Sequence, residues 1–249
     1  MTTMRRGVTT IGLLAAAFAA AGGVWLTGSG GQRVGRQAFD LAALRALPDQ
    51  FPRTADFDFV PPEPGSYALP PIKPAASAVL LDHTGVRVDL GSLLKGRISL
   101  VSFVYLTCTD VNGCPLAMSL LYEIEHASRT AAPLRVSVQL VTISFDPKRD
   151  PPAALAALAD PRRAEVAAGH VMDWHFLTGT SEEDLKPLLK GFGQVVDRGT
   201  DLGRINHTLR LFLVDASGRI RNIYGLGTMD PRLLMSDIAT LLLEQAGAG

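Results

Sequence analysis

The sequence predicts an α/β fold with a central mixed β-sheet flanked by helices. Two apolar, β-branched runs, Ile98–Tyr105 and Val136–Ile143, are typical of strands buried on both faces of a sheet. Between them, Pro115–Arg129 carries leucine and isoleucine at helical spacing, and the right-handed crossover rule then makes the two strands parallel. A later pair of runs, Leu209–Val214 and Ile220–Tyr224, is typical of an antiparallel hairpin and makes the sheet mixed.

The N-terminal segment, residues 1–30, predicts a signal peptide or a transmembrane anchor. Arg5 and Arg6 precede the apolar stretch Ile11–Leu26, and a basic start followed by an apolar run is an export signal. About 20 apolar residues also suffice to span the bilayer. We favour an uncleaved anchor, because the apolar run continues past the peptidase-like residues Ala19–Ala21.

The positive-inside rule keeps the two arginines in the cytoplasm and places the following chain outside it. We therefore expect a protein of the periplasm or of the outer face of the cytoplasmic membrane, with a secreted form if the leader is cleaved. The chain has 249 residues with 24 basic and 24 acidic side chains, so its formal net charge is zero. No basic run supports binding to nucleic acid, and we expect none.

Residues 31–76 predict a proline-rich tether with one short helix over Phe39–Leu47. Prolines cannot form a helix interior or a central strand, so the later part of this segment is expected to be extended and stiff. Six prolines lie in this part, at positions 61, 62, 64, 70, 71 and 74. An arm packed on the domain is the alternative, because four large apolar residues accompany them: Phe57, Phe59, Tyr67 and Ile72.

The main domain is expected at residues 77–249, and its other elements follow from local spacing. In chain order they are a hairpin (Ala78–Leu81 and Val86–Val88), a helical turn (Leu90–Lys95), a helix (Pro151–Ala168) broken at Asp160–Pro161, a strand (Trp174–Leu177), a helix (Ser181–Phe192) with Ser181 as its N-cap, and a last helix (Pro231–Gln245).

The only two cysteines, Cys108 and Cys114, follow the first buried strand with five residues between them. Ligands in parallel sheets collect at the carboxyl ends of the strands, where this loop lies. Asn112-Gly113 is a turn signal that brings the two cysteines together, since both residues tolerate positive φ. Pro115 suits the first turn of a helix, so Cys114 is expected near the N-cap, where the helix dipole favours the thiolate.

Such a pair can bind a soft metal, form a redox disulfide, or do both; a structural disulfide across so short a loop would stabilise little. Among the five histidines His207 differs, because its polar loop faces the cysteine end of the sheet; the others (His83, His126, His170 and His175) are expected to be surface or packed residues. Two thiolates and an imidazole suit Cu(I), with Cu(II) also possible, whereas zinc would need a fourth ligand. Met118 is either a weak axial ligand or a core residue, and Asp110 is expected to be a turn residue or cap.

Several segments of the chain, in this order and spacing, resemble the Sco (SenC) family over about Ala78–Leu243. They comprise the strand, the cysteine loop with its proline and helix, Val141–Asp150, Asn206-His207-Thr208 and Leu211–Gly218. The resemblance implies a thioredoxin-like fold and a membrane-tethered copper protein that assists maturation of the copper centre of cytochrome oxidase. It implies Cys108, Cys114 and His207 as copper ligands, and a mainly structural role for the signature Ser144–Pro151.

The implied partners are the copper-receiving subunit of a respiratory oxidase and other copper chaperones or thiol reductants. The family's usual motif has three residues between the cysteines and Asp before the histidine, whereas this chain has five residues and Asn206. The alternative function is a thiol–disulfide oxidoreductase that uses Cys108 and Cys114 without metal. The absence of a two-residue spacing counts against a general reductase, and Thr107 directly before Cys108 does not fit the peroxiredoxin pattern. We therefore expect a metallochaperone before an enzyme.

Overall fold

The structure is a computed structural model and describes residues 40–53, 57–110, 112–198 and 205–247. The expected membrane segment, Ile11–Leu26, lies outside these ranges. Within them, none of the helices has the length and apolar character needed to cross a membrane.

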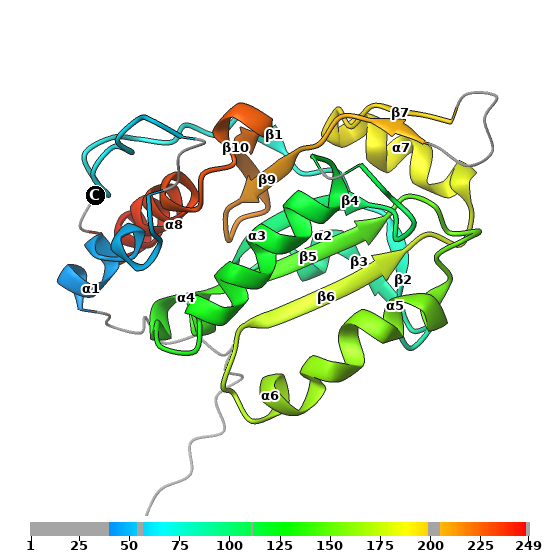
Figure 1. Cartoon of the computed structure of the whole chain (residues 1–249), viewed down its shortest axis with the longest axis horizontal. Helices are drawn as coiled ribbons and strands as arrows, with labels where there is room; N and C mark the ends of the chain where they lie inside the picture. The colour runs from blue at the N-terminus through cyan, green and yellow to red at the C-terminus, as the bar shows by residue number, and fades with distance from the viewer. Residues whose placement is uncertain (1–39, 54–56, 111, 199–204, 248–249) are drawn as a thin grey trace, which may run out of the picture. The chain divides into compact units, whose positions relative to one another are not determined.

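A mixed sheet forms the centre of the main domain, with eight strands in the part of the chain that the structure describes (Figure 1). Its strand order is β1-β10-β9-β4-β5-β6-β2-β3. The bounds are β1 Lys73–Pro74, β2 Val79–Asp82, β3 Arg87–Asp89, β4 Ile98–Val104, β5 Val138–Ser144, β6 Asp173–Thr178, β9 Leu211–Val214 and β10 Arg219–Tyr224. This architecture confirms the predicted α/β class.

The middle of the sheet is parallel, as the crossover argument predicts. Strands β4 and β5 pair in parallel with Val101 opposite Val141, and β6 continues the parallel set on the far side of β5. Every residue of β4 and of β5 is buried, which explains why both strands are continuous apolar, β-branched runs. The carboxyl ends of β4 and β5 therefore meet at one edge of the sheet.

Helices cover both faces of this sheet. Their bounds are α1 Leu41–Arg45, α2 Leu90–Leu93, α3 Cys114–Ala127, α4 Ala132–Ser137, α5 Pro152–Ala159, α6 Arg163–Ala167, α7 Glu182–Phe192 and α8 Pro231–Ala246, with short 3-10 turns at Pro48–Gln50, Asp160–Arg162 and Leu226–Thr228. One apolar core contains side chains of α3, α4, α5 and α8, and the other contains side chains of α2 and α7. The two sulfurs lie in the second core.

Local signals hold for most elements, whereas the strands predicted from Val136 and Leu209 each begin two residues later. Ser181 caps α7 by accepting a hydrogen bond from the Asp184 amide (3.2 Å), and the break expected at Asp160–Pro161 is a 3-10 turn. The strand predicted from Val136 begins instead at Val138. Residues 132–137 form helix α4, with a proline in its first turn, and this helix leads directly into β5.

The described part of the proline-rich segment is a packed arm. Leu44 and Leu47 are 0% and 1% exposed and join the core that contains α8. The Tyr67 hydroxyl donates to the Asp237 carboxylate on α8, and the Ile72 amide donates to the carbonyl of Ile220 at 2.8 Å. Of the two arrangements left open for this segment, the structure therefore has the packed arm over its described residues.

Candidate metal centre

The cysteine loop is folded by Asp110. Its backbone carbonyl accepts a hydrogen bond from the Gly113 amide at 2.8 Å, and its Oδ1 accepts one from the Asn112 amide at 3.1 Å. The expected turn is present, but its glycine does not use a positive φ, because the φ of Gly113 is −105°. Glycine is needed there for space: a Cβ would lie 3.1 Å from the Asp110 carbonyl oxygen and 3.3 Å from the Cys108 Sγ.

Cys114 is the first residue of α3, with Gly113 as the N-cap, as the position of Pro115 predicts. Its side chain is buried against the second core. Burial raises the pKa of the Cys114 thiol to about 12, opposed only in part by backbone hydrogen bonds from the loop and the helix start. The backbone N–H at the helix start does favour the thiolate, as expected, but desolvation of the charged form outweighs it in the metal-free protein.

His207 is held opposite the cysteines by a small two-stranded sheet. Strand β8 (Asn206–His207) pairs antiparallel with β7 (Val196–Asp197), and His207 lies opposite Val196. The imidazole packs edge-on against Tyr105, with ring centroids 5.6 Å apart, and against Phe145 at 5.3 Å. Aromatic walls thus fix the plane of the ring.

The hydrogen bonds of His207 point Nε2 toward the sulfurs. Its Nδ1 lies 3.4 Å from the carbonyl oxygen of Ile205, which can only accept, so Nδ1 carries the proton. Nε2 then offers its lone pair to Cys114, whose Sγ is 3.4 Å away. Burial lowers the pKa of His207, against the opposing effects of the Ile205 carbonyl and the Asp110 charge. The ring is neutral at physiological pH, which is the form that binds metal.

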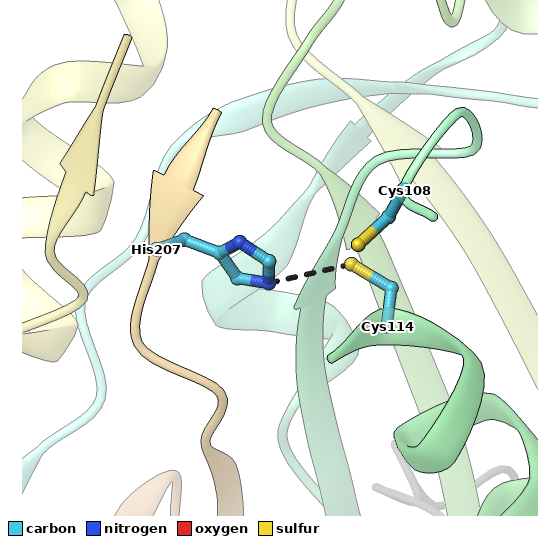
Figure 2. Close-up of side chains that lie close together, drawn as sticks. All are labelled: Cys108, Cys114 and His207. Carbon is cyan, nitrogen blue, oxygen red and sulfur yellow. Dashed lines mark hydrogen bonds between the residues drawn. The ribbon is translucent and has the colours of Figure 1, made fainter. Parts of the chain in front are cut away.

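Figure 2 shows the three predicted ligands pointing toward one another from the loop after β4, the start of α3 and strand β8. One ligand atom from each of Cys108, Cys114 and His207 lies within 4.8 Å of the others, and the two cysteines are free thiols. Across the described ranges this is the only group of three or more such side chains close enough to share a metal. The other four histidines do not join it.

The donor set fits a soft metal. Two sulfurs and a neutral imidazole nitrogen suit Cu(I), and the nitrogen also permits Cu(II). Met118 packs against both apolar cores, so the structure gives it a core position. A pocket of about 370 Å³ opens on the group and is lined by Tyr105, Cys108, Thr109, Asp110, Ile205, Asn206 and His207. Cys114 is absent from this lining, so Cys108 and His207 are the ligands reached from outside.

Asp150 fastens the cysteine loop to the sheet, a role that residue-level reasoning on the sequence did not identify. One of its carboxylate oxygens accepts from the Leu106 amide at 2.9 Å and from the Ser144 hydroxyl at 2.6 Å. It thereby joins the chain after β4 to the end of β5. Asp150 lies in the signature Ser144–Pro151, for which the family resemblance implies a structural role. Its hydrogen bonds to Leu106 and Ser144 are contacts that fit this role. Tyr105 and Phe145, the walls around His207, are ordinary strand-end aromatics in the sequence and carried no signal.

Comparison with known proteins identifies the family and the fold. The sequence model of the SCO1/SenC family matches residues 75–243, whereas no curated protein sequence matches the chain. Among solved structures, a SCO1/SenC family lipoprotein from Bacillus anthracis has 23% identity and a TM-score of 0.54, covering 69% of this chain and 96% of its own. Bradyrhizobium japonicum ScoI with copper bound has 23% identity and a TM-score of 0.51, covering 67% and 98%.

A third structure is that of BsSco, described as having a disulfide switch and as a member of the Sco family of cytochrome c oxidase assembly proteins. It has 22% identity and a TM-score of 0.52, covering 70% of this chain and 96% of its own. The mixed sheet with helices on both faces is the thioredoxin-like fold of these structures, as predicted. Because the family match extends over most of the chain, the protein belongs to the SCO1/SenC family.

Proposed function

We propose that this protein binds copper through Cys108, Cys114 and His207 outside the cytoplasm and assists maturation of the copper centre of a respiratory oxidase. The observation that carries the proposal is the convergence of the three donor atoms within 4.8 Å from three separate elements. Copper is the cargo in this role, and the chain supplies two sulfur donors and one nitrogen donor.

The comparisons support the choice of metal and of process. The chain belongs to the SCO1/SenC family, one similar structure is a ScoI with copper bound, and another belongs to a family of cytochrome c oxidase assembly proteins. The five-residue spacing of the cysteines is compatible with this role. Asp110 and Gly113 fold the longer loop so that both sulfurs still reach the imidazole.

The geometry suggests how each residue contributes. His207 is oriented by the Ile205 carbonyl, so its Nε2 needs no reorganisation to bind metal. Cys114 must lose its proton before its sulfur can bind, and the buried apolar surroundings oppose the free thiolate. Cys108 and His207 line the pocket, so exchange with the thiols of an oxidase subunit, another copper chaperone or a thiol reductant takes place from that side.

The location follows from the N-terminal sequence. Arg5, Arg6 and the apolar stretch Ile11–Leu26 support a protein held at the outer face of the cytoplasmic membrane, and one similar structure is that of a lipoprotein. A reporter enzyme that is active only outside the cytoplasm, fused after Gly249, should be active. Activity of a cytoplasm-specific reporter at the same position would contradict this location.

Copper titration of the reduced, metal-free chain tests the proposed site. The unmodified chain should retain one copper, and His207→Ala should weaken retention, of Cu(II) most of all, because two thiolates can still hold Cu(I) linearly. His126→Ala removes an exposed histidine on α3 and is the matched control. Equal copper retention by His207→Ala and His126→Ala would exclude His207 as a ligand.

A thiol–disulfide oxidoreductase is the second candidate, favoured by two free, adjacent thiols of which Cys108 lines a pocket. This function needs both cysteines and does not use His207. In cells it predicts normal oxidase maturation with His207→Ala and none with either cysteine variant. The copper function predicts that all three variants fail, while the His207→Ala protein still forms and reduces its disulfide.

A further inference from the structure

Among the residues that the structure describes, Asp110 is the one that brings a carboxylate to the lining of the pocket over the three ligands. Its backbone carbonyl and Oδ1 are occupied by the amides of Gly113 and Asn112, so the loop itself fixes where this side chain stands. The side chain is exposed, and it does not belong to the group of ligand atoms within 4.8 Å. Asp110 therefore places a negative charge at the mouth of the site without being one of its three ligands.

This charge is close enough to act on the ligand group. Asp110 lines the same pocket as Cys108 and His207, and it lies two residues from Cys108 along the chain. A unit negative charge attracts Cu(II) about twice as strongly as Cu(I) at the same distance, because the Coulomb energy scales with the product of the charges. Carboxylate oxygens also suit a harder ion better than they suit Cu(I). Both effects act in the same direction.

We propose that Asp110 is a specificity-determining residue that shifts the relative affinity of this site toward Cu(II). The inference rests on the proposed copper binding and adds to it the oxidation state that the pocket mouth favours. Solvent screens an exposed carboxylate, so the effect is several-fold and depends on ionic strength. The three ligands provide the affinity for both ions, and the charge of Asp110 changes the ratio of the Cu(II) affinity to the Cu(I) affinity.

Asp110→Asn removes the negative charge and keeps the fold of the loop. The amide oxygen of asparagine can accept the same hydrogen bond from Asn112, and the backbone bond to Gly113 is unchanged, so the loop keeps its turn. Glu183→Gln is the matched control. It removes one negative charge from exposed residue 183 on α7, which has no place in the pocket lining. Asp110→Glu keeps the charge and should retain the shift toward Cu(II).

The experiment measures Cu(II) and Cu(I) affinities of the full chain by competition with chelators of known affinity. At low salt, Asp110→Asn should lower the ratio of Cu(II) to Cu(I) affinity by at least about threefold, and about 0.5 M salt should shrink this difference. Asp110→Glu and Glu183→Gln should keep the ratio of the unmodified chain.

An unchanged ratio in Asp110→Asn, or an equal loss of affinity for both ions, would overturn the role of Asp110 while leaving copper binding intact. Failure of the unmodified chain to bind either ion would instead overturn the proposed function, and this inference with it. The absorption spectrum of the Cu(II) complex gives a second readout. A ligand field that is the same in Asp110→Asn supports action through charge alone, whereas loss of the spectrum contradicts it.

Discussion

Gly113 allows two cysteines with five residues between them to share one site. Its Cα faces the Asp110 carbonyl and the Cys108 sulfur, and both would lie within 3.3 Å of an added Cβ. That is tighter than an ordinary van der Waals contact, and the carbonyl is backbone that cannot rotate away. The absence of a side chain at this residue therefore lets the start of α3 pack closely against the Asp110 carbonyl and the Cys108 sulfur.

Gly113→Ala should consequently weaken copper binding with little loss of global stability. Displacing one sulfur by a few tenths of an ångström should lower copper affinity by about tenfold, or about 1.4 kcal/mol. Gly227→Ala is the control, because a Cβ there meets no atom within 4 Å and its φ is not positive. Chelator competition measures the affinity and chemical unfolding measures the stability. Equal copper affinity in the two variants would contradict this role for Gly113.

The raised pKa of Cys114 predicts how stability depends on pH. Its ordinary value is 9.0 and its value in the folded chain is about 12, so the folded state keeps a proton that the unfolded state loses. The contribution is present below pH 9 and is lost as pH rises toward 12. Between pH 7.5 and 10 the metal-free chain should lose roughly 1 kcal/mol of unfolding free energy through this group.

Chemical unfolding of the reduced chain at pH 7.5 and 10 measures this loss, and Cys114→Ala should show a smaller one. Comparing the change with pH, instead of the absolute stability, removes the effect of the cavity that the substitution leaves. Staying at or below pH 10 limits the contributions of Tyr67 and Tyr224, whose pKa values are raised from 10.0. An equal loss in both proteins would show that Cys114 does not titrate in this way.

The three ligand residues could be predicted from sequence, but the environment of the site could not. Cys108 and Cys114 follow a strand end, and His207 lies in a polar loop before another strand, so topology alone brings them to one edge. The high pKa of Cys114 depends on burial by residues that are distant in the sequence. The aromatic walls Tyr105 and Phe145 likewise act only through packing, for which spacing carries no signal.

At the scale of elements, long periodic segments were predictable and short ones were not. Strands β4 and β5 and helix α3 each bury enough residues to leave a clear apolar pattern. Strands β7 and β8 have two residues each, which is too few for any alternation to appear. Val136 is β-branched and therefore predicts a strand, whereas it lies in helix α4, which has a proline in its first turn.

Asp150 is the contact through which β5 supports the cysteine loop, and its removal should affect both stability and the metal site. Asp150→Ala leaves the buried Ser144 hydroxyl and the Leu106 amide without this acceptor, which should cost about 1–3 kcal/mol of unfolding free energy. Copper affinity should fall as well, because Leu106 precedes Cys108 by two residues. Asp150→Asn retains an acceptor oxygen and should be milder on both measurements. Wild-type copper affinity in Asp150→Ala would contradict the support role.

At the scale of the whole molecule, the described arm is part of the main domain and extends it beyond the family match. The match begins at residue 75, whereas Leu44 already lies in the same apolar core as the side chains of α8. Tyr67 and Tyr224 both donate to the buried carboxylate of Asp237, which also accepts from Asn222 at 2.7 Å. The prolines of this segment are typical of a linker. Its packing depends on contacts with α8, which is distant in the sequence, so the local pattern could not predict it.

Removing the arm should therefore destabilise the domain. A chain that begins at residue 75 lacks Leu44, Leu47, Phe51 and Leu69, which are at most 8% exposed. At about 1.5–3 kcal/mol for each buried side chain, the loss is comparable to the 5–15 kcal/mol net stability of a whole domain. We expect this chain to unfold at much lower denaturant than a chain that begins at residue 40, or to aggregate through exposed α8. Equal unfolding midpoints for the two chains would show that the arm adds no stability and that residues 75–249 are the complete folding unit.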